Sequence, residues 1–297
     1  MTDCPSYIAT IGFFDGVHIG HSFLLSQLVA RASEQGLRSL VITFDRHPRS
    51  VIDGEDIPLL TTMQERLAYL RKQPVDEVLC LPFEDICRLT ALEFMTMLKQ
   101  KYNVVSLLMG YDHRFGSDRL RSFDQYASIA RQVGLDIAHL PALEPDESFS
   151  PHVSSSQIRM ALEIGDVEYA AKMLGHPYTI TGTVVHGKGI GKQIGFPTAN
   201  LFVPADKMLP LAGVYAVKVS SDECATLAKE AKAVFNVGTN PTIGDNPVTL
   251  EVHIPHFSGD LYGQQLTLAL YKRIRDEIRF DSLKELKQQI QKDIRHL

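Results

Sequence analysis

Five short apolar runs, separated by longer segments of helical period, constrain the first half of this chain most strongly. The runs are rich in β-branched residues and nearly free of polar ones, as expected for strands whose two faces are both covered by helices. This alternation predicts consecutive βαβ units and a parallel α/β sheet. The predicted strands are, in chain order, YIATIGF, SLVITF, EVLCLPF, VVSLLMG and LDIAHLP.

The pattern changes after Gly175 to alternation with a period of two, broken by glycine and proline turns. Such alternation predicts antiparallel strands in an all-β sandwich or barrel. In VTLEVHI, residues 248–254, the apolar side chains share one face, and Thr249, Glu251 and His253 lie on the other. An apolar stripe at helical spacing predicts a terminal helix over residues 280–297. We place the domain boundary so that the domains are residues 1–176 and 177–297.

Composition narrows the possible partners and the compartment. The 297 residues carry a formal net charge of -5, which gives no broad basic face for a nucleic acid. No apolar run approaches the roughly 20 residues needed to span a bilayer, so we expect no membrane partner. The four cysteines, Cys4, Cys80, Cys87 and Cys224, are widely scattered. This spacing is typical of the reduced thiols of a cytoplasmic protein.

The segment IGFFDGVHIGH, residues 11–21, follows the first predicted strand and opens a predicted helix. At the carboxyl end of a parallel strand, free helix amides and the helix dipole favour an anionic phosphate. His18 and His21 share one face of the helix start and can donate hydrogen bonds to the same phosphates. The alternative is a pair of ordinary histidines beside a turn. The predicted ATP-binding residues of this segment are Gly12, Phe13, Asp15, Gly16 and Gly20.

A second polar cluster opens another predicted helix at SSSQIR, residues 154–159. The hydroxyls of Ser154, Ser155 and Ser156 can cap the helix or bind a phosphate. Arg159 can clamp oxyanions in fork geometry. The alternative is a plain helix cap with a solvated arginine. TFDRHP, residues 43–48, and GYDHRFG, residues 110–116, lie at the ends of two predicted strands, where ligands gather or where simple turns are built.

HIGH at residues 18–21 together with SSSQIR resembles the nucleotidylyltransferase superfamily, and TFDRHP and GYDHRFG resemble segments of its prokaryotic FAD synthetase branch. The resemblance implies a Rossmann-like domain in which His18, His21 and Arg159 bind the triphosphate of ATP and stabilise the leaving pyrophosphate. Two positions depart from the family pattern, because Phe13 replaces a frequent Asn and Arg46 a frequent Pro. The flavin-binding residues that the resemblance implies are Phe44, Pro48, Asp112, Phe115 and Gly116.

A glycine-rich stretch, residues 182–200, stands near the start of the second domain. Repeated glycines permit amide nests that bind anions, and lysines add positive charge. The order of residues is not that of a P-loop, and a purely structural glycine-rich hairpin is the alternative. The predicted ATP-binding residues of this stretch are Gly187, Lys188, Gly191, Lys192, Gly195 and Pro197.

PTAN, residues 197–200, places the hydroxyl of Thr198 and the amide oxygen of Asn200 two residues apart, and both are hard ligands suited to Mg²⁺. Phosphorylating a hydroxyl also calls for a base, and Glu251 is the best candidate because it lies on the non-core face of its strand. The glycine stretch with PTAN resembles the riboflavin kinase family. That resemblance implies a β-barrel in which Thr198 and Asn200 hold Mg²⁺ and Glu251 is catalytic.

Both sets of motifs occur in the order found in the prokaryotic bifunctional riboflavin kinase/FAD synthetases, which the chain resembles from about residue 8 to 294. The resemblance implies that riboflavin, FMN and ATP are substrates, that Mg²⁺ is required, and that the protein is a monomer or weak homo-oligomer. Two alternatives remain. A class I aminoacyl-tRNA synthetase fragment shares HIGH but would need a KMSKS-like loop, and a non-catalytic flavin carrier would keep the binding sites without the chemistry.

Overall fold

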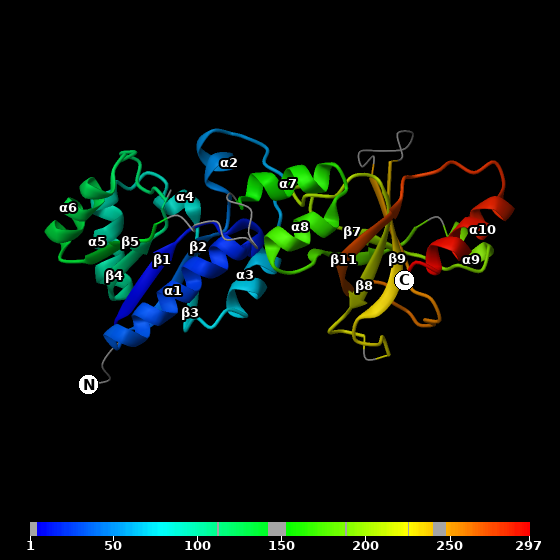
Figure 1. The fold of residues 1–297 in the computed structure, drawn as a ribbon, viewed down its shortest axis with the longest axis horizontal. Helices are drawn as coiled ribbons and strands as arrows, with labels where there is room; N and C mark the ends of the chain where they lie inside the picture. The colour runs from blue at the N-terminus through cyan, green and yellow to red at the C-terminus, as the bar shows by residue number, and fades with distance from the viewer. Residues whose placement is uncertain (1–4, 112, 142–152, 188, 225, 240–247) are drawn as a thin grey trace. The chain divides into compact units, whose positions relative to one another are not determined.

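The computed structural model describes residues 5–111, 113–141, 153–187, 189–224, 226–239 and 248–297. The chain forms two compact units, Met1–Ser154 and Ser155–Leu297 (Figure 1). Our sequence-based boundary lies later, between residues 176 and 177. The difference arises because two helices before that boundary join the second unit, where the backbone amide of Leu211 donates a 2.9 Å hydrogen bond to the carbonyl of Leu162.

The first unit is built on a parallel five-stranded sheet with the order β3-β2-β1-β4-β5. This arrangement confirms the predicted Rossmann-like α/β fold. The strand order reverses between β1 and β4, and ligands of such sheets bind beyond the carboxyl ends of the strands at this point. The strands are β1 (Tyr7–Ile11), β2 (Arg38–Phe44), β3 (Glu77–Leu81), β4 (Val104–Met109) and β5 (Asp136–His139).

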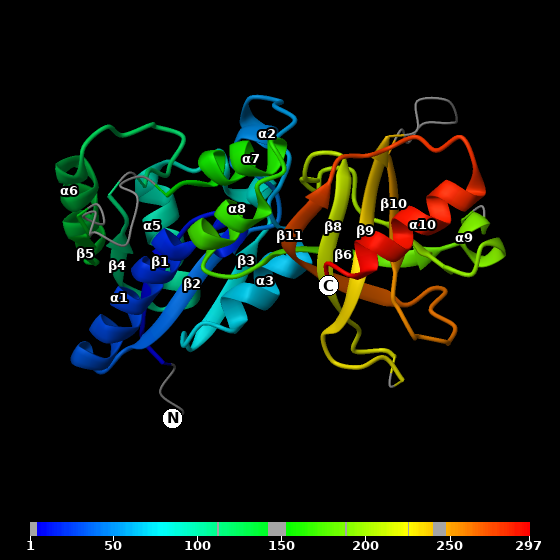
Figure 2. The ribbon, with the colours of Figure 1, turned by 45° about the vertical axis from the view of Figure 1, so that its right-hand side comes forward.

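Helices cover both faces of this sheet (Figure 2). Helices α1 and α3 pack on one face through Leu25, Leu28 and Leu70, whereas α4, α5 and α6 pack on the other. Helix α1 is capped at its C-terminus by Gly36, whose φ of 63° is the left-handed conformation common at this position. The helices are η1 (Asp15–Val17), α1 (Ile19–Gln35), α2 (Pro48–Ile52), α3 (Met63–Arg71), α4 (Phe83–Ile86), α5 (Ala91–Tyr102) and α6 (Phe123–Val133).

The second unit is a closed antiparallel barrel whose described strands follow the order β10-β7-β6-β11-β8-β9. The barrel confirms the predicted all-β second domain, and a C-terminal helix follows it as expected. The strands are β6 (Tyr178–Val185), β7 (Ala199–Phe202), β8 (Gly213–Ser220), β9 (Ala231–Thr239), β10 (Val248–His253) and β11 (Gln265–Arg275). The helices are α7 (Ser155–Glu163), α8 (Val167–Leu174), α9 (Ile190–Gln193) and α10 (Leu283–Ile294).

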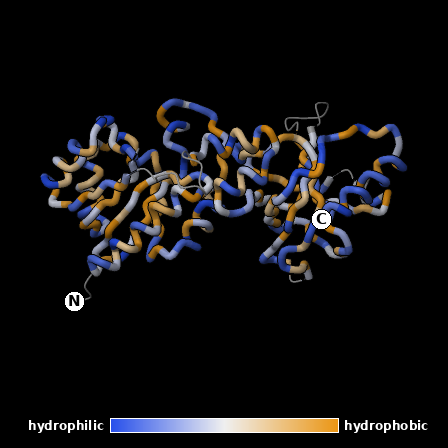
Figure 3. Tube along the Cα trace, in the orientation of Figure 1, coloured by the Kyte–Doolittle hydropathy of each residue, from blue (hydrophilic) through white to orange (hydrophobic). Residues whose placement is uncertain are grey.

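The terminal helix α10 is held by an ion pair in addition to the predicted apolar stripe. Its buried side chain is Asp293, which is 1% exposed and accepts three hydrogen bonds from Arg275, the shortest of them 2.7 Å long. Leu283, which belongs to the stripe, is 56% exposed. The hydropathy trace draws most of this helix as hydrophilic (Figure 3). The other stripe residues, Leu286, Ile290, Ile294 and Leu297, are half-buried, so an ion pair to β11 adds to the apolar contacts of the helix.

Two further features concern the state of the cysteines and the length of the helices. Cys80, Cys87 and Cys224 are free thiols, as predicted, and Cys4 lies outside the described residues. Among the residues that the structure describes, no helix is long and apolar enough to cross a membrane.

Candidate active sites

The two histidines of the first unit lie side by side at the start of α1. The backbone before them turns through left-handed conformations at Phe14 (φ 56°), Gly16 (φ 78°) and Val17 (φ 42°). His18 then caps the helix, and its Nδ1 accepts a long 3.4 Å hydrogen bond from the backbone amide of His21. The two imidazole rings stack with centroids 3.6 Å apart. The structure thus brings the predicted pair together at the carboxyl edge of β1.

Both histidines are neutral at neutral pH. His18 is 6% exposed, and burial lowers its pKa to about 4 although the Asp15 carboxylate acts in the opposite direction. Burial, and secondarily the neighbouring His18, holds the pKa of His21 well below its usual range. Because Nδ1 of His18 accepts a hydrogen bond, its ring proton lies on Nε2. The pair can therefore donate hydrogen bonds to phosphate oxygens without carrying charge.

Asp15 has a structural task in the turn. Its carboxylate accepts hydrogen bonds of 3.0 Å from the amides of Leu60 and Thr61 and from the hydroxyl of Thr61. The same hydroxyl accepts a 3.0 Å hydrogen bond from the amide of Gly16. Sequence reasoning placed Asp15 on the phosphate and missed Thr61, whose partner lies far away in the sequence. Asp15 thus orients the turn that carries the histidines.

At two predicted glycines of this segment, a larger residue would crowd a neighbouring aromatic ring. A methyl group at Gly20 would lie 3.2 Å from the His18 ring, which is closer than most such contacts. A methyl group at Gly12 would lie 2.9 Å from the Phe14 ring, and the amide of Gly12 donates a 3.0 Å hydrogen bond to the carbonyl of Ile42. Both glycines therefore allow side chains of the turn to lie against the backbone.

The remaining predicted residues of this site are distributed as follows. Phe13 is partly buried, and its ring packs edge-to-face against His47 at 4.7 Å. Ser154 precedes α7, which contains Ser155, Ser156 and Arg159 and belongs to the second compact unit. The partnership of Arg159 with the histidines involves both units and stays a prediction.

A cavity of about 260 Å³ opens beyond the carboxyl ends of β2, β3 and β4. Four predicted flavin-binding residues, Phe44, Pro48, Phe115 and Gly116, line it together. Asp112 lies outside the described residues. The other lining residues are Ile52, Phe83, Ile86, Cys87, Leu89, Phe94, His113, Arg114, Ser117 and Arg119.

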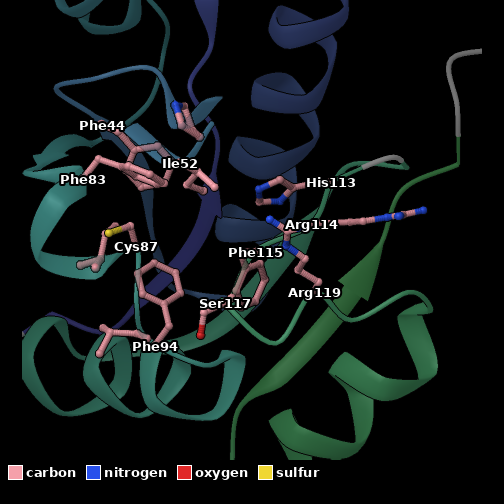
Figure 4. Close-up of a pocket in the computed structure, with 14 residues that line it drawn as sticks. Phe44, Ile52, Phe83, Cys87, Phe94, His113, Arg114, Phe115, Ser117 and Arg119 are labelled. Atoms are coloured by element: carbon pink, nitrogen blue, oxygen red, sulfur yellow. The ribbon is translucent and has the colours of Figure 1, made fainter. Parts of the chain in front are cut away.

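Aromatic rings form the inner walls of the cavity (Figure 4). Phe44 packs against Phe83 at 5.1 Å, and Phe115 packs against Phe94 at 5.5 Å. The Tyr126 hydroxyl fixes the backbone of Phe115, because it accepts from the Phe115 amide at 3.0 Å and donates to the Phe115 carbonyl at 2.8 Å. Sequence reasoning missed Phe83 and Phe94, which reach the cavity from helices rather than from strand ends.

Basic side chains occupy another side of the same cavity. Figure 4 shows His113, Arg114 and Arg119 together, away from Phe44 and Phe83. No carboxylate belongs to the lining residues that the structure describes. Gly116, with a φ of 93°, makes the turn between the two sides, and a methyl group there would overlap the Asp118 carboxylate. The cavity can hold a planar aromatic ring system that carries an anionic group.

The second constellation lies on the barrel, where PTAN meets β10. The Thr198 hydroxyl donates a 3.1 Å hydrogen bond to Oε2 of Glu251. Glu251 is paired across the strands with Asn200 on β7. All three side chains are partly buried. The structure thus brings the predicted base and both predicted metal ligands to one place.

The glycine loop folds back over these residues. A methyl group at Gly187 would overlap the side-chain amide of Asn200. One at Gly191 would overlap the carbonyl oxygen of Phe196 and lie 3.3 Å from the Thr198 hydroxyl. These two predicted glycines are therefore required by the close approach of the loop.

Other predicted residues of the loop surround this core. Lys192 is exposed on α9, and Gly195 follows it with a φ of 88°. Lys188 lies outside the described residues. The carbonyl of Pro197 accepts a 2.8 Å hydrogen bond from Nδ1 of His253. His253 was expected on the non-core face of its strand but is 8% exposed, because it packs against Phe196 and holds the PTAN backbone.

The donor set of this constellation fits a hard cation. Within the described residues, no group of three or more His, Cys, Asp or Glu side chains gathers as a metal site. Thr198 and Asn200 instead supply a hydroxyl and an amide oxygen beside the Glu251 carboxylate. Such oxygen ligands suit Mg²⁺, which keeps several waters and shares phosphate oxygens with its nucleotide.

Comparison with known proteins places both constellations in one family. Residues 2–157 match the family model described as FAD synthetase, and residues 174–297 match the model described as riboflavin kinase. A curated bifunctional riboflavin kinase/FMN adenylyltransferase from Pseudomonas fluorescens is 38% identical over 97% of this chain and 90% of its own length. The chain belongs to the bifunctional riboflavin kinase/FMN adenylyltransferase family.

Two further relatives also match nearly the whole length of this chain. The bifunctional riboflavin kinase/FMN adenylyltransferase of Escherichia coli K12 is 38% identical over 96% of this chain and 90% of its own length. A solved structure from Streptococcus pneumoniae, described as a macrolide-efflux protein, is 32% identical and has a TM-score of 0.83, covering 98% of this chain and 93% of that one. The family resemblance seen in the sequence is confirmed, and the chain is a transferase with both activities of the family. The aminoacyl-tRNA synthetase fragment and the non-catalytic carrier are set aside.

Proposed function

We propose that the first unit adenylates FMN with ATP to give FAD and pyrophosphate, and that the second phosphorylates riboflavin with ATP to give FMN. The observation that carries the proposal is the stacked pair of His18 and His21 at the same sheet edge as the aromatic cavity. A nucleotide and a flavin would then meet beyond the carboxyl ends of neighbouring strands, where such sheets bind ligands.

In the adenylylation step, an oxygen of the FMN phosphate attacks the α-phosphorus of ATP. The bond from that phosphorus to the bridging oxygen breaks, and pyrophosphate leaves with the electron pair. His18 donates from Nε2 and His21 donates from its own N–H, so both stabilise negative charge that grows on the leaving group. Arg159 is the predicted third contact to the pyrophosphate. No covalent enzyme intermediate is needed, because both substrates are held for direct in-line transfer.

The cavity supplies the flavin site of this step. Its aromatic wall, which includes Phe44 and Phe115, would bury the isoalloxazine ring. Its basic side, with His113 and Arg114, would face the ribityl phosphate. The flavin phosphate is then directed out of the apolar interior toward the bound nucleotide.

In the kinase step, Glu251 accepts the proton of the ribityl 5′-hydroxyl while that oxygen attacks the γ-phosphorus of ATP, and ADP leaves. The hydrogen bond from Thr198 holds the carboxylate in place. Thr198 and Asn200 would hold Mg²⁺, which neutralises phosphate charge when it is bound. The glycine loop, with Gly187 and Gly191 close to these ligands, would wrap the phosphates.

The setting of the protein follows from these substrates. We place the enzyme in the cytoplasm because ATP and riboflavin are available there. Its partners are small molecules rather than nucleic acid or membrane, and we expect a monomer or a weak homo-oligomer. The acidic net charge of -5 supports the exclusion of nucleic acid.

One assay tests the assignment of the two reactions to the two units. The purified chain is incubated with riboflavin, ATP and Mg²⁺, and flavins are separated over time. We expect FMN first and FAD later. Glu251→Gln should stop FMN formation and still convert added FMN to FAD, whereas the double substitution His18→Ala with His21→Ala should make FMN and no FAD. The assignment would be contradicted if Glu251→Gln failed to convert added FMN to FAD, or if the double histidine variant failed to form FMN from riboflavin.

A further inference from the structure

Arg66, on helix α3, is a charged side chain that neither proposed reaction uses. It is 0% exposed. Its guanidinium carbon lies 3.8 Å from the centroid of the Phe13 ring, and its Nη2 donates a 2.5 Å hydrogen bond to the backbone carbonyl of Phe44. Burying a cation costs free energy that an apolar side chain of similar volume avoids. A buried arginine at this place therefore calls for a reason beyond packing.

The two contacts of Arg66 join the ends of adjacent strands. Phe13 follows β1 and leads into the turn that carries His18, whereas Phe44 ends β2 and lines the aromatic cavity. The strand ends are joined by a 3.1 Å hydrogen bond from the Thr43 hydroxyl to the carbonyl of Phe13. One planar guanidinium thus contacts both the segment before the histidines and the wall of the cavity.

Phe13 extends the connection to a second part of the cavity wall. Its ring packs edge-to-face against His47, whose Nδ1 accepts a 3.2 Å hydrogen bond from the amide of Arg49 at the start of α2. The next residue, Pro48, lines the cavity. Phe13 replaces the asparagine that is frequent in the family, and its ring supplies the flat face on which the guanidinium of Arg66 stacks.

We propose that Arg66 is a positioning residue for adenylyl transfer, which together with Phe13 fixes the distance between the histidine turn and the flavin cavity. This inference rests on the proposed function of the first unit. Arg66 does not line the cavity, so it acts through Phe13 and Phe44 rather than on a substrate. In-line transfer needs reacting atoms about 3–3.5 Å apart, so a small shift between the two pockets lowers the rate more than it weakens binding of either substrate.

The test uses the full chain with three substitutions and one control. Arg66→Met removes charge and planarity, Arg66→Lys keeps the charge, and Phe13→Leu removes the flat face. Arg71→Lys is the matched control, since Arg71 lies on the same helix but is exposed. Steady-state kinetics give kcat and KM for FMN and for ATP, riboflavin kinase activity serves as the internal reference, and the unfolding midpoint reports stability.

We expect Arg66→Met to lower the adenylylation kcat about 10- to 100-fold, because misplacement of bound reactants costs rate at this scale. Both KM values should stay within about threefold, which separates positioning from uniform binding. Arg66→Lys should restore part of the rate. Phe13→Leu should also lower kcat, and the double variant Phe13→Leu with Arg66→Met should lose little more than the worse single variant, since the two residues act as a unit.

Three results would overturn the proposal: an unchanged kcat in Arg66→Met and Phe13→Leu, a rise in the FMN KM at unchanged kcat, or a loss of rate that only follows the fraction of unfolded protein. Should Arg66→Met fail to fold, Arg66→Lys and Phe13→Leu carry the same test, and wild-type kcat in both would overturn it. A wild-type chain that makes no FAD would instead contradict the proposed function.

Discussion

The Thr198 hydroxyl donates a 3.1 Å hydrogen bond to the Glu251 carboxylate, which joins the PTAN segment to the strand opposite it. A base for the ribityl hydroxyl must be held still beside the metal and the phosphates. The hydrogen bond therefore positions both the proposed general base, Glu251, and one of the proposed Mg²⁺ ligands, Thr198.

Glu251→Gln keeps the shape of this side chain and removes its ability to take a proton. We expect the riboflavin kinase kcat to fall about 10²- to 10⁴-fold, as for other losses of a general base. The KM for ATP should change little, and conversion of FMN to FAD should be unaffected. Glu168→Gln, at an exposed position of α8, is the control. A kinase rate near that of the wild type would show that another group accepts the proton.

Gly20→Ala tests the position of the His18 ring. The added methyl group would lie 3.2 Å from that ring and should push it out of its stack with His21. We expect the adenylylation kcat to fall about tenfold. This is less than the effect of removing a charge-stabilising hydrogen-bond donor completely, because the His18 ring is displaced rather than lost. Stability should not fall, because alanine favours a helix over glycine by up to about 1 kcal/mol. Ser33→Ala, exposed on the same helix, is the control, and equal rates in both variants would refute the idea.

Tyr126→Phe removes the hydroxyl that holds the backbone of Phe115. Both hydrogen bonds, of 3.0 and 2.8 Å, are lost, so the wall of the cavity becomes less fixed. Each is worth about 1 kcal/mol, and we expect the Kd for FMN, measured by quenching of flavin fluorescence, to rise about 5- to 20-fold. Riboflavin phosphorylation by the second unit should keep its KM. An unchanged Kd would mean that the flavin binds elsewhere.

The depressed pKa of His18 predicts a pH dependence of stability. The folded pKa is about 4, below the usual 6.5, so between these values the unfolded chain binds a proton that the folded chain does not. The contribution of His18 to the stability of the first unit should be full above pH 6.5 and should fall by about 3 kcal/mol as the pH drops to 4, in addition to the loss from His21. His18→Gln should flatten this dependence in denaturant titrations. A slope equal to that of the wild type would mean that His18 is protonated equally in both states.

The fold and the gathering of site residues were largely predictable from the sequence. Strands alternated with helices, and the carboxyl ends of parallel strands must meet at one edge. Phe44 and Phe115 lie at the ends of different strands, the family resemblance implied that both bind the flavin, and the structure shows that both line one cavity. Glu251 and Asn200 were predicted for the same kinase site, whereas their pairing across β10 and β7 is seen in the structure alone.

What the sequence did not reveal depends on tertiary contacts between distant segments. Nothing in the sequence links Asp15, a predicted ATP-binding residue, to Thr61, which accounts for two of its hydrogen bonds. Phe83 and Arg66 reach the site from helices whose inward faces are set by packing. His253 alternates with the polar face of its strand yet is buried by Phe196 and by the Pro197 carbonyl.

The central claim is that each unit binds its own nucleotide. Calorimetric titration of the chain with a non-hydrolysable ATP analogue and Mg²⁺ measures this directly. We predict two sites per chain, one lost in the double substitution His18→Ala with His21→Ala and the other lost in Gly187→Ala. A single site, or the loss of both sites in either variant, would contradict the account.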